Sequence, residues 1–151
     1  MIRVQAEDFD VGLELNKLTN SKHNIGGVSC FIGLVRDIAG KNTVNSMTLE
    51  HYPEMTQKAL VEIEEEALNR WNLSKTLIIH RFGKLNPGDQ IVLVAAASAH
   101  RKAAIEATQF LIDWLKTKAP FWKLEETPDG GQWVNAMSSD EIATKKWLKE
   151  R

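Results

Sequence analysis

The stretch Ile91-Val92-Leu93-Val94-Ala95-Ala96-Ala97-Ser98-Ala99-His100-Arg101 decides the fold. Its first seven residues are apolar and do not alternate with polar ones, which predicts a strand buried on both faces at the centre of a sheet. A helix begins at Ser98 or Ala99, and Pro120 ends it. The spacing predicts the inner stripe of that helix to be Ala103, Ala107, Phe110 or Leu111, Trp114 and Lys118.

The segments on either side of this strand and helix complete an α+β pattern. β-rich residues predict further strands at 2–6, 28–35, 44–51, 76–82, 121–127 and 132–135. Residues 37–42 are expected to form a loop. The element order favours one domain over residues 1–151 with a mostly antiparallel or mixed sheet.

Three more helices are indicated by caps and by apolar spacing. Asp8 or Asp10 caps the first helix, and a capping box of Ser138 and Glu141 begins the last. The longest starts at Pro53, in the first-turn position that proline tolerates. Its predicted inner face repeats every four residues, at Met55, Ala59, Ile63, Ala67 and Trp71.

Charge and cysteine content limit the partners and the compartment. Nineteen Lys and Arg against twenty Asp and Glu give a formal net charge of −1, so we expect no broad basic surface for nucleic acid and no membrane association. Cys30 is the only cysteine and is interpreted as a small core residue rather than a nucleophile. Without a possible internal disulfide or a signal-peptide pattern, a cytoplasmic location is expected.

Common catalytic motifs are absent from the sequence. The four histidines lack the paired spacing of zinc ligands, so no metal site is expected. No phosphate-binding loop has the required glycine spacing. His51 and His80, at the ends of predicted strands, are interpreted as structural.

His100 and Arg101 are the first candidate site residues. They follow the central strand at the start of a helix, where free N–H groups and the helix dipole favour anions. Two basic side chains do not stabilise a helix at its N-terminal end. They predict an anion site; the alternative is a local cap at His100 with a solvated Arg101.

Lys116 and Lys123 are the second pair of candidates. They flank Pro120 and the aromatic residues Phe121 and Trp122. A lysine held against an aromatic ring loses water, which lowers its pKa and makes it a usable base or nucleophile. The alternative is that the lysines complement the helix C-terminus while the aromatic residues are core.

Arg36 is the third candidate, at the end of an apolar strand and before a loop. An exposed arginine in a loop is the alternative reading. If the five candidates converge, they form a pocket for a multiply anionic ligand, although the chain has no net positive charge. The five are Arg36, His100, Arg101, Lys116 and Lys123.

At these residues the sequence resembles the MoaE family, the large, catalytic subunits of molybdopterin synthase. The matching segments run in family order over nearly the whole chain. Five segments that match in this order are specific to the family. They are 31–37 (FIGLVRD), 49–53 (LEHYP), 80–83 (HRFG) with 87–89 (PGD), 97–101 (ASAHR) and 115–123 (LKTKAPFWK).

The resemblance implies an α/β hammerhead-type domain, with a small β subdomain, that forms a homodimer. It implies a heterotetramer in which a small ubiquitin-like, MoaD-like carrier binds each end and inserts its C-terminal Gly-Gly tail. Sulfur from the tail thiocarboxylate would pass to cyclic pyranopterin monophosphate to give the dithiolene of molybdopterin. This sulfurtransferase would need no cofactor.

The resemblance also implies roles for residues. Arg36, His100 and Arg101 would hold the substrate phosphate, Lys116 would act as acid/base at the tail, and Lys123 would orient the pterin. Four further residues would adjoin the substrate: Leu34, Val35, Leu124 and Glu125.

Two departures from the family pattern reduce the expected positive charge. Met137 and Leu124 stand where basic residues are frequent. Two other functions remain open from the residues alone. One is an enzyme acting on a different phosphorylated heterocycle without a carrier, and the other is a non-catalytic module that docks a ubiquitin-like tail.

Overall fold

The computed structural model describes residues 1–39, 42–134 and 138–148. The four helices are α1 (Val11–Thr19), α2 (Pro53–Arg70), α3 (Arg101–Lys118) and α4 (Ser138–Leu148). The ten strands are β1 (Ile2–Gln5), β2 (Gly27–Leu34), β3 (Ile38–Ala39), β4 (Asn42–Thr43), β5 (Ser46–His51), β6 (Lys75–Arg81), β7 (Gly83–Leu85), β8 (Gln90–Ser98), β9 (Phe121–Thr127) and β10 (Gly130–Val134).

The first sheet has the strand order β1-β6-β8-β2. β1 runs parallel to β6, whereas β8 is antiparallel to both of its neighbours. The residues from Val92 to Ser98 are buried on both faces of the sheet, so the predicted central strand is confirmed. The predicted α+β class and mixed sheet are confirmed with it.

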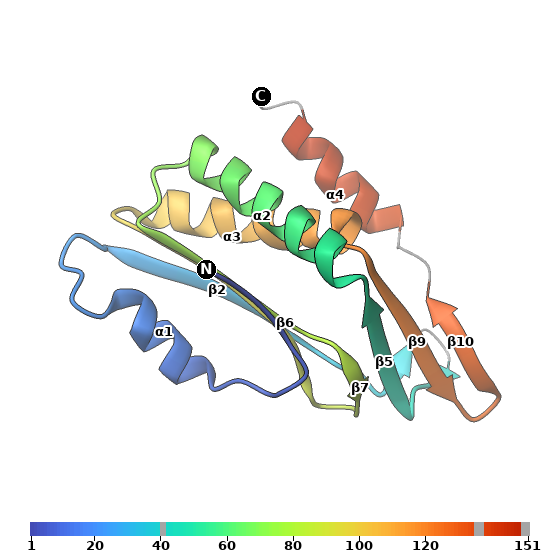
Figure 1. Cartoon of the computed structure of the whole chain (residues 1–151). Coiled ribbons are helices and arrows are strands. Elements are labelled where there is room, and N and C mark those ends of the chain that lie inside the picture. Colours follow the sequence, from blue (N-terminus) through green and yellow to red (C-terminus); the bar gives the residue numbers. More distant parts are fainter. Residues whose placement is uncertain (40–41, 135–137, 149–151) are drawn as a thin grey trace.

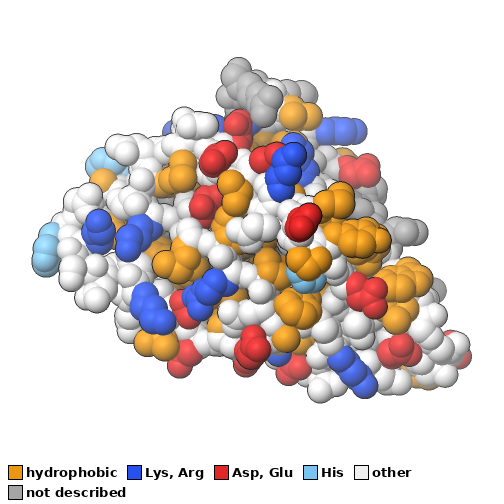
Figure 2. All heavy atoms as spheres, viewed as in Figure 1, with side chains coloured by type: hydrophobic (Ala, Val, Ile, Leu, Met, Phe, Trp, Pro, Cys, Tyr) orange, Lys and Arg blue, Asp and Glu red, His pale blue; other side chains and the backbone are white. Residues whose placement is uncertain are grey.

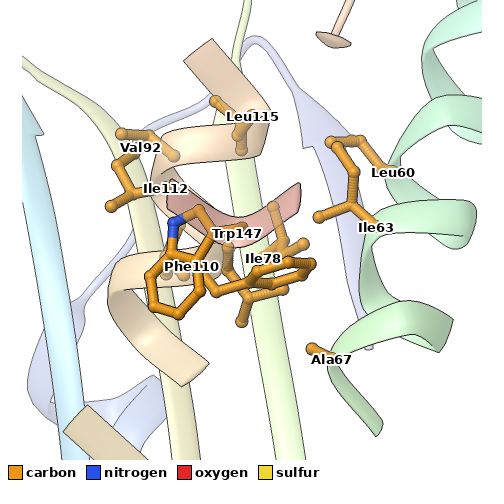
Figure 3. Packing of buried hydrophobic residues seen from close by; sticks show 11 residues of the cluster. Leu60, Ile63, Ala67, Ile78, Val92, Phe110, Ile112, Leu115 and Trp147 are labelled. Atoms are coloured by element: carbon orange, nitrogen blue, oxygen red, sulfur yellow. The ribbon is translucent and has the colours of Figure 1, made fainter. Parts of the chain in front are cut away.

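Helices cover the two faces of this sheet unequally (Figure 1). α2, α3 and α4 lie on one face, where Phe110 and Trp147 pack edge to face at 5.5 Å and belong to one core cluster with Ile78 (Figure 3). A buried indole N–H needs a hydrogen-bond partner. Trp147 Nε1 has one, because it donates to Asp113 Oδ2 at 2.8 Å. α1 covers part of the other face, over Leu77, Ile79 and Leu93.

The second sheet has the order β10-β9-β5-β7 and lies at one end of the first (Figure 1). β9 follows α3 and pairs antiparallel with β5, which places Lys123 opposite Leu49 and Glu125 opposite Met47. Met47 and Leu49 pack against Val35, just beyond β2. This cluster joins the second sheet to the end of β2.

Three sequence expectations about burial or loops were wrong. Met55 and Lys118 are exposed, and α2 instead buries Thr56, Leu60, Ile63 and Ala67. A strict four-residue repeat drifts about 40° per step around a helix with 3.6 residues per turn, so Met55 leaves the core face while Ile63, Ala67 and Trp71 stay in the core. The predicted loop at 37–42 contains a strand pair, in which Ile38 is paired with Thr43.

The third expectation concerned Cys30, which is exposed rather than buried. β2 is an edge strand, and Cys30 shares its exposed row with Val28 and Ile32. Their partners on β8 face the α1 side of the sheet, so this apolar row lies beside α1. An apolar strand read from sequence does not reveal that its outer part is left uncovered.

Candidate active site

Lys116 and Lys123 approach each other across the turn that joins α3 to β9. Lys116 lies in the last turn of α3, which ends before Pro120, and Phe121 begins β9. Burial lowers the pKa of Lys123, and the positive charge of Lys116 lowers that pKa further. Asp140 and Glu125 act in the opposite direction. The lysine predicted to lose water next to an aromatic residue is therefore Lys123.

Successive side chains of β9 lie on opposite faces of the sheet, so the predicted site residues of this strand are divided between the two faces. Lys123 and Glu125 lie on the face that carries Leu49 and Met47, because paired residues share a face of a sheet. Glu125 is 6% exposed. Leu124 points to the opposite face, where its partner on β10 is Trp133. A basic residue in place of Leu124 would thus not face the Lys123 amine.

Arg36 lies on the same side of the molecule as Lys123. The preceding residue, Val35, is 3% exposed and packs against Met47 and Leu49. Its backbone is held by a hydrogen bond from its N–H to the Asp89 carbonyl at 2.9 Å. Leu34 and Arg36, on either side of it, are exposed. Val35 therefore fixes the chain, while its neighbours present their side chains to a ligand.

His100 and Arg101 follow the last residue of β8, at the opposite end of the β2–β8 pair from Arg36. Gly27 pairs with Ser98, whereas Leu34 pairs with Gln90. The eight residues of β2 at about 3.3 Å each place the two ends about 25 Å apart. Both side chains are exposed.

The helix α3 separates the same groups. Arg101 is its first residue and Lys116 lies in its last turn, about 22 Å apart at 1.5 Å per residue. One copy of the chain thus places Lys116 and Lys123 on either side of the turn between α3 and β9, and it holds His100 and Arg101 far from Lys116 and from Arg36. The convergence expected of all five does not occur within a single copy.

Close backbone packing fixes the position of His100. The Gly26 N–H donates to the Ser98 carbonyl at 2.9 Å. A Cβ on Gly26 would lie 2.0 Å from the carbonyl oxygen of Ala99, a distance that no side chain tolerates. Glycine is therefore required where the start of β2 crosses the turn that carries His100.

Gly26→Ala is expected to lower the free energy of unfolding by about 1–3 kcal/mol, because the two backbone segments must separate. Urea unfolding followed by circular dichroism measures this change. The control is Gly12→Ala in α1, whose Cβ would lie 3.5 Å from Asp10 Oδ1. That variant should gain about 0.5–1 kcal/mol, as alanine does over glycine inside a helix. Equal midpoints for Gly26→Ala and the unchanged chain would contradict the packing described.

Sequence reasoning set His80 aside as structural, yet it lies next to Lys123. The His80 ring stacks on Phe121 at 3.7 Å, with 13° between the ring planes. Burial lowers the pKa of His80 to about 3, and the charge of Lys123 contributes to that lowering. A lone histidine in an apolar strand gives no sequence signal for such a neighbour.

No group of three or more His, Cys, Asp or Glu side chains within residues 1–39, 42–134 and 138–148 is arranged to hold a metal ion. Among these residues, no helix is long and apolar enough to cross a membrane. Acidic and basic side chains are interspersed on the face shown in Figure 2. Met137 lies outside the described residues.

Comparisons with known proteins identify the family that this chain matches. Residues 4–118 match the family described as MoaE protein. The molybdopterin synthase catalytic subunit of Ralstonia nicotianae is 53% identical over 146 residues, covering 97% of this chain and 83% of the relative.

Two solved structures also resemble this chain. The molybdopterin biosynthesis MoaE protein from Burkholderia ambifaria superposes with a TM-score of 0.84 at 47% identity, covering 98% of this chain and 97% of that one. Molybdopterin synthase from Staphylococcus aureus superposes with a TM-score of 0.80 at 31% identity, covering 88% of this chain and 96% of that one.

Proposed function

The chain belongs to the MoaE family, and from this we propose that it is the sulfur-transferring subunit of a molybdopterin synthase. It takes sulfur from the C-terminal thiocarboxylate of a small ubiquitin-like carrier and transfers it to cyclic pyranopterin monophosphate, which yields the dithiolene of molybdopterin. The observation that carries this proposal is the Lys116–Lys123 pair, which places a partly desolvated amine beside a second positive charge.

The chemistry requires fixed positive charge, since both the thiocarboxylate and the substrate phosphate are anions. Lys116 acts as acid/base at the carrier tail and polarises its acyl carbon, while Lys123 orients the pterin. The lowered pKa of Lys123 also makes it a better proton donor than an ordinary lysine. Glu125, Leu34 and the backbone of Val35 adjoin the substrate, and Leu124 supports the strand from its other face.

The remaining cations are supplied by a second copy of the chain. β2 is an edge strand with an exposed apolar row at Val28, Cys30 and Ile32, and such an edge readily pairs with another strand. Antiparallel pairing of two β2 strands about a two-fold axis puts the end of one beside the start of the other. Arg36 of one copy then meets His100 and Arg101 of the second copy, and the three hold the phosphate.

The resulting assembly is a homodimer with one carrier at each end, a heterotetramer. Each chain acts as one large-subunit domain over residues 1–151. The pterin is a substrate, the subunit needs no resident cofactor, and the reaction takes place in the cytoplasm.

Ile32→Lys tests the β2 interface. Burying an unpaired lysine in a strand pair costs several kcal/mol, so dimerisation should weaken by about 100-fold or more. Sedimentation velocity across a concentration series measures the change. Leu68→Lys is the matched control, because Leu68 is also an exposed apolar residue but lies on α2. An Ile32→Lys protein that stays dimeric wherever the control does would rule out pairing through β2.

Mixing the purified protein with thiocarboxylated carrier and the pterin precursor tests the proposed function directly. Mass spectrometry should detect the dithiolene product, and none should form with a carrier that ends in an ordinary carboxylate. Turnover without any carrier would indicate an enzyme acting on another phosphorylated heterocycle. Carrier binding without product would indicate a docking module.

A further inference from the structure

Three strands contribute rings to one aromatic cluster where the two sheets meet. His80 comes from β6, His51 from β5 and Phe121 from β9. Phe121 stacks on His80 at 3.7 Å and lies 5.6 Å from His51, whose ring is 4.8 Å from Phe82. These contacts fix the first residue of β9, two positions before Lys123.

His80 is locked in a single neutral form within this cluster. Its side chain is 3% exposed, and Nδ1 lies 2.7 Å from the carbonyl oxygen of Arg81. Nδ1 therefore carries the proton and donates it, which leaves Nε2 unprotonated. Because burial lowers the pKa of His80 to about 3, the ring remains uncharged near neutral pH.

The cluster lies between Lys123 and a surface groove. His51 and Phe82 line a groove of about 810 Å³ together with Val4 and Val61, on the face where hydrophobic side chains surround a histidine (Figure 2). On the other side, His80 is close enough to Lys123 for the lysine charge to affect its pKa. Phe121 lies 5.6 Å from the groove residue His51 and stacks on His80, and the Phe121–His80 pair is called the wall below.

Several charged groups face this wall. The groups that act on Lys123 are Lys116 from α3, Asp140 from α4 and Glu125 from β9, and those that act on His80 are Lys123 from β9 and His51 from β5. Lys116 opposes a positive charge on Lys123, whereas Asp140 and Glu125 favour one. Desolvation by burial lowers the pKa of Lys123 more than any one charged neighbour changes it.

We propose that His80 is a positioning residue for sulfur transfer, which stacks on Phe121 to exclude groove water from Lys123 and to fix the start of β9. The inference rests on the proposed function for its catalytic meaning. The effect of His80 on the Lys123 amine can be measured without any substrate.

Competitive labelling with an amine-reactive reagent across pH 6–11, read by mass spectrometry, gives the titration midpoint of Lys123 directly. A lowered pKa leaves more neutral amine at a given pH, so Lys123 should titrate below the 10.5 of an ordinary lysine. In His80→Ala, water enters and the Lys123 midpoint should rise towards 10.5. Titration midpoints are compared rather than labelling rates, because the substitution also changes the access of the reagent to the amine.

Three further variants separate positioning from simple stability. His80→Phe keeps a ring on Phe121 and should retain the low midpoint, whereas Phe121→Ala opens the same wall and should raise it even if His80→Ala fails to fold. Trp71→Ala removes an aromatic packed 5.3 Å from Phe110 in the main core. It should lower the melting temperature without moving the Lys123 midpoint.

The rate–pH profile of sulfur transfer should shift upward with the labelling midpoint in His80→Ala and Phe121→Ala, and not in His80→Phe. If every folded wall variant keeps the wild-type midpoint, His80 has only a structural role and the inference is overturned. If the unchanged protein transfers no sulfur but the midpoints shift as expected, the wall stands and the proposed function fails.

Discussion

Lys116→Ala and Lys123→Ala are each expected to slow sulfur transfer by about 10²-fold or more, the usual contribution of a positioned proton-transfer group. Lys116 lies in the last turn of α3 and Lys123 two residues beyond Phe121 in β9, so both flank the same turn. Loss of either removes positive charge where two anions must approach. Single-turnover conversion of thiocarboxylated carrier, followed by mass spectrometry, measures each effect.

Two controls sharpen this prediction. Lys118→Ala removes a lysine from the same helix end whose ammonium lies 4.5 Å from the ring centre of Trp114, and it should react at the wild-type rate. Lys116→Arg keeps the charge but cannot release a proton near neutral pH, so it should remain impaired. If Lys116→Ala and Lys123→Ala both converted carrier at the wild-type rate, the proposed roles would be wrong.

Arg36→Ala and Arg101→Ala are expected to raise the KM for the pterin substrate by about 10- to 100-fold, since a charge-assisted hydrogen bond contributes about 1.5–3 kcal/mol. Both side chains are exposed, and they lie just beyond the ends of β2 and β8 respectively. Initial rates over a range of pterin concentrations measure the effect. Lys58→Ala, on the exposed side of α2, is the control and should leave KM unchanged.

The local parts of this molecule were predictable from the residues that form them. The uninterrupted apolar run at 91–97 predicts a central strand because both faces of such a strand are buried. Asp10 caps α1 by accepting a hydrogen bond from the Leu13 N–H at 2.9 Å. Pro53 lies in the first turn of α2 and Pro120 follows α3, as the fixed φ and missing N–H of proline require.

The positions of the site residues relative to one another were harder to predict from the sequence. The expected helix from Ser98 to Pro120 already carried His100 at one end and Lys116 at the other, which prevents their meeting within one copy. The separation of Arg36 from His100 depends on β2 running antiparallel to β8. Strand pairing of this kind joins distant segments, and no local pattern encodes it.

Burial depends on the same non-local pairing. Cys30 and Ile32 look like core residues in a β-rich run, yet β2 is the sheet edge and both are exposed. His80 lies in an equally apolar strand, and β9 returns to stack Phe121 on it. Two apolar strands therefore gave an exposed row in β2 and a buried histidine in β6.

Complementation between two variants with a raised KM, assayed at a pterin concentration well below the wild-type KM, tests most directly whether the site is shared by two copies. Arg36→Ala and Arg101→Ala chains are unfolded together in equal amounts, refolded and assayed with thiocarboxylated carrier. Random pairing makes half of the dimers mixed, and each mixed dimer has one intact site and one doubly altered site. Sulfur transfer should return to about a quarter of the wild-type rate. A mixture no more active than the two variants refolded separately would contradict the shared site.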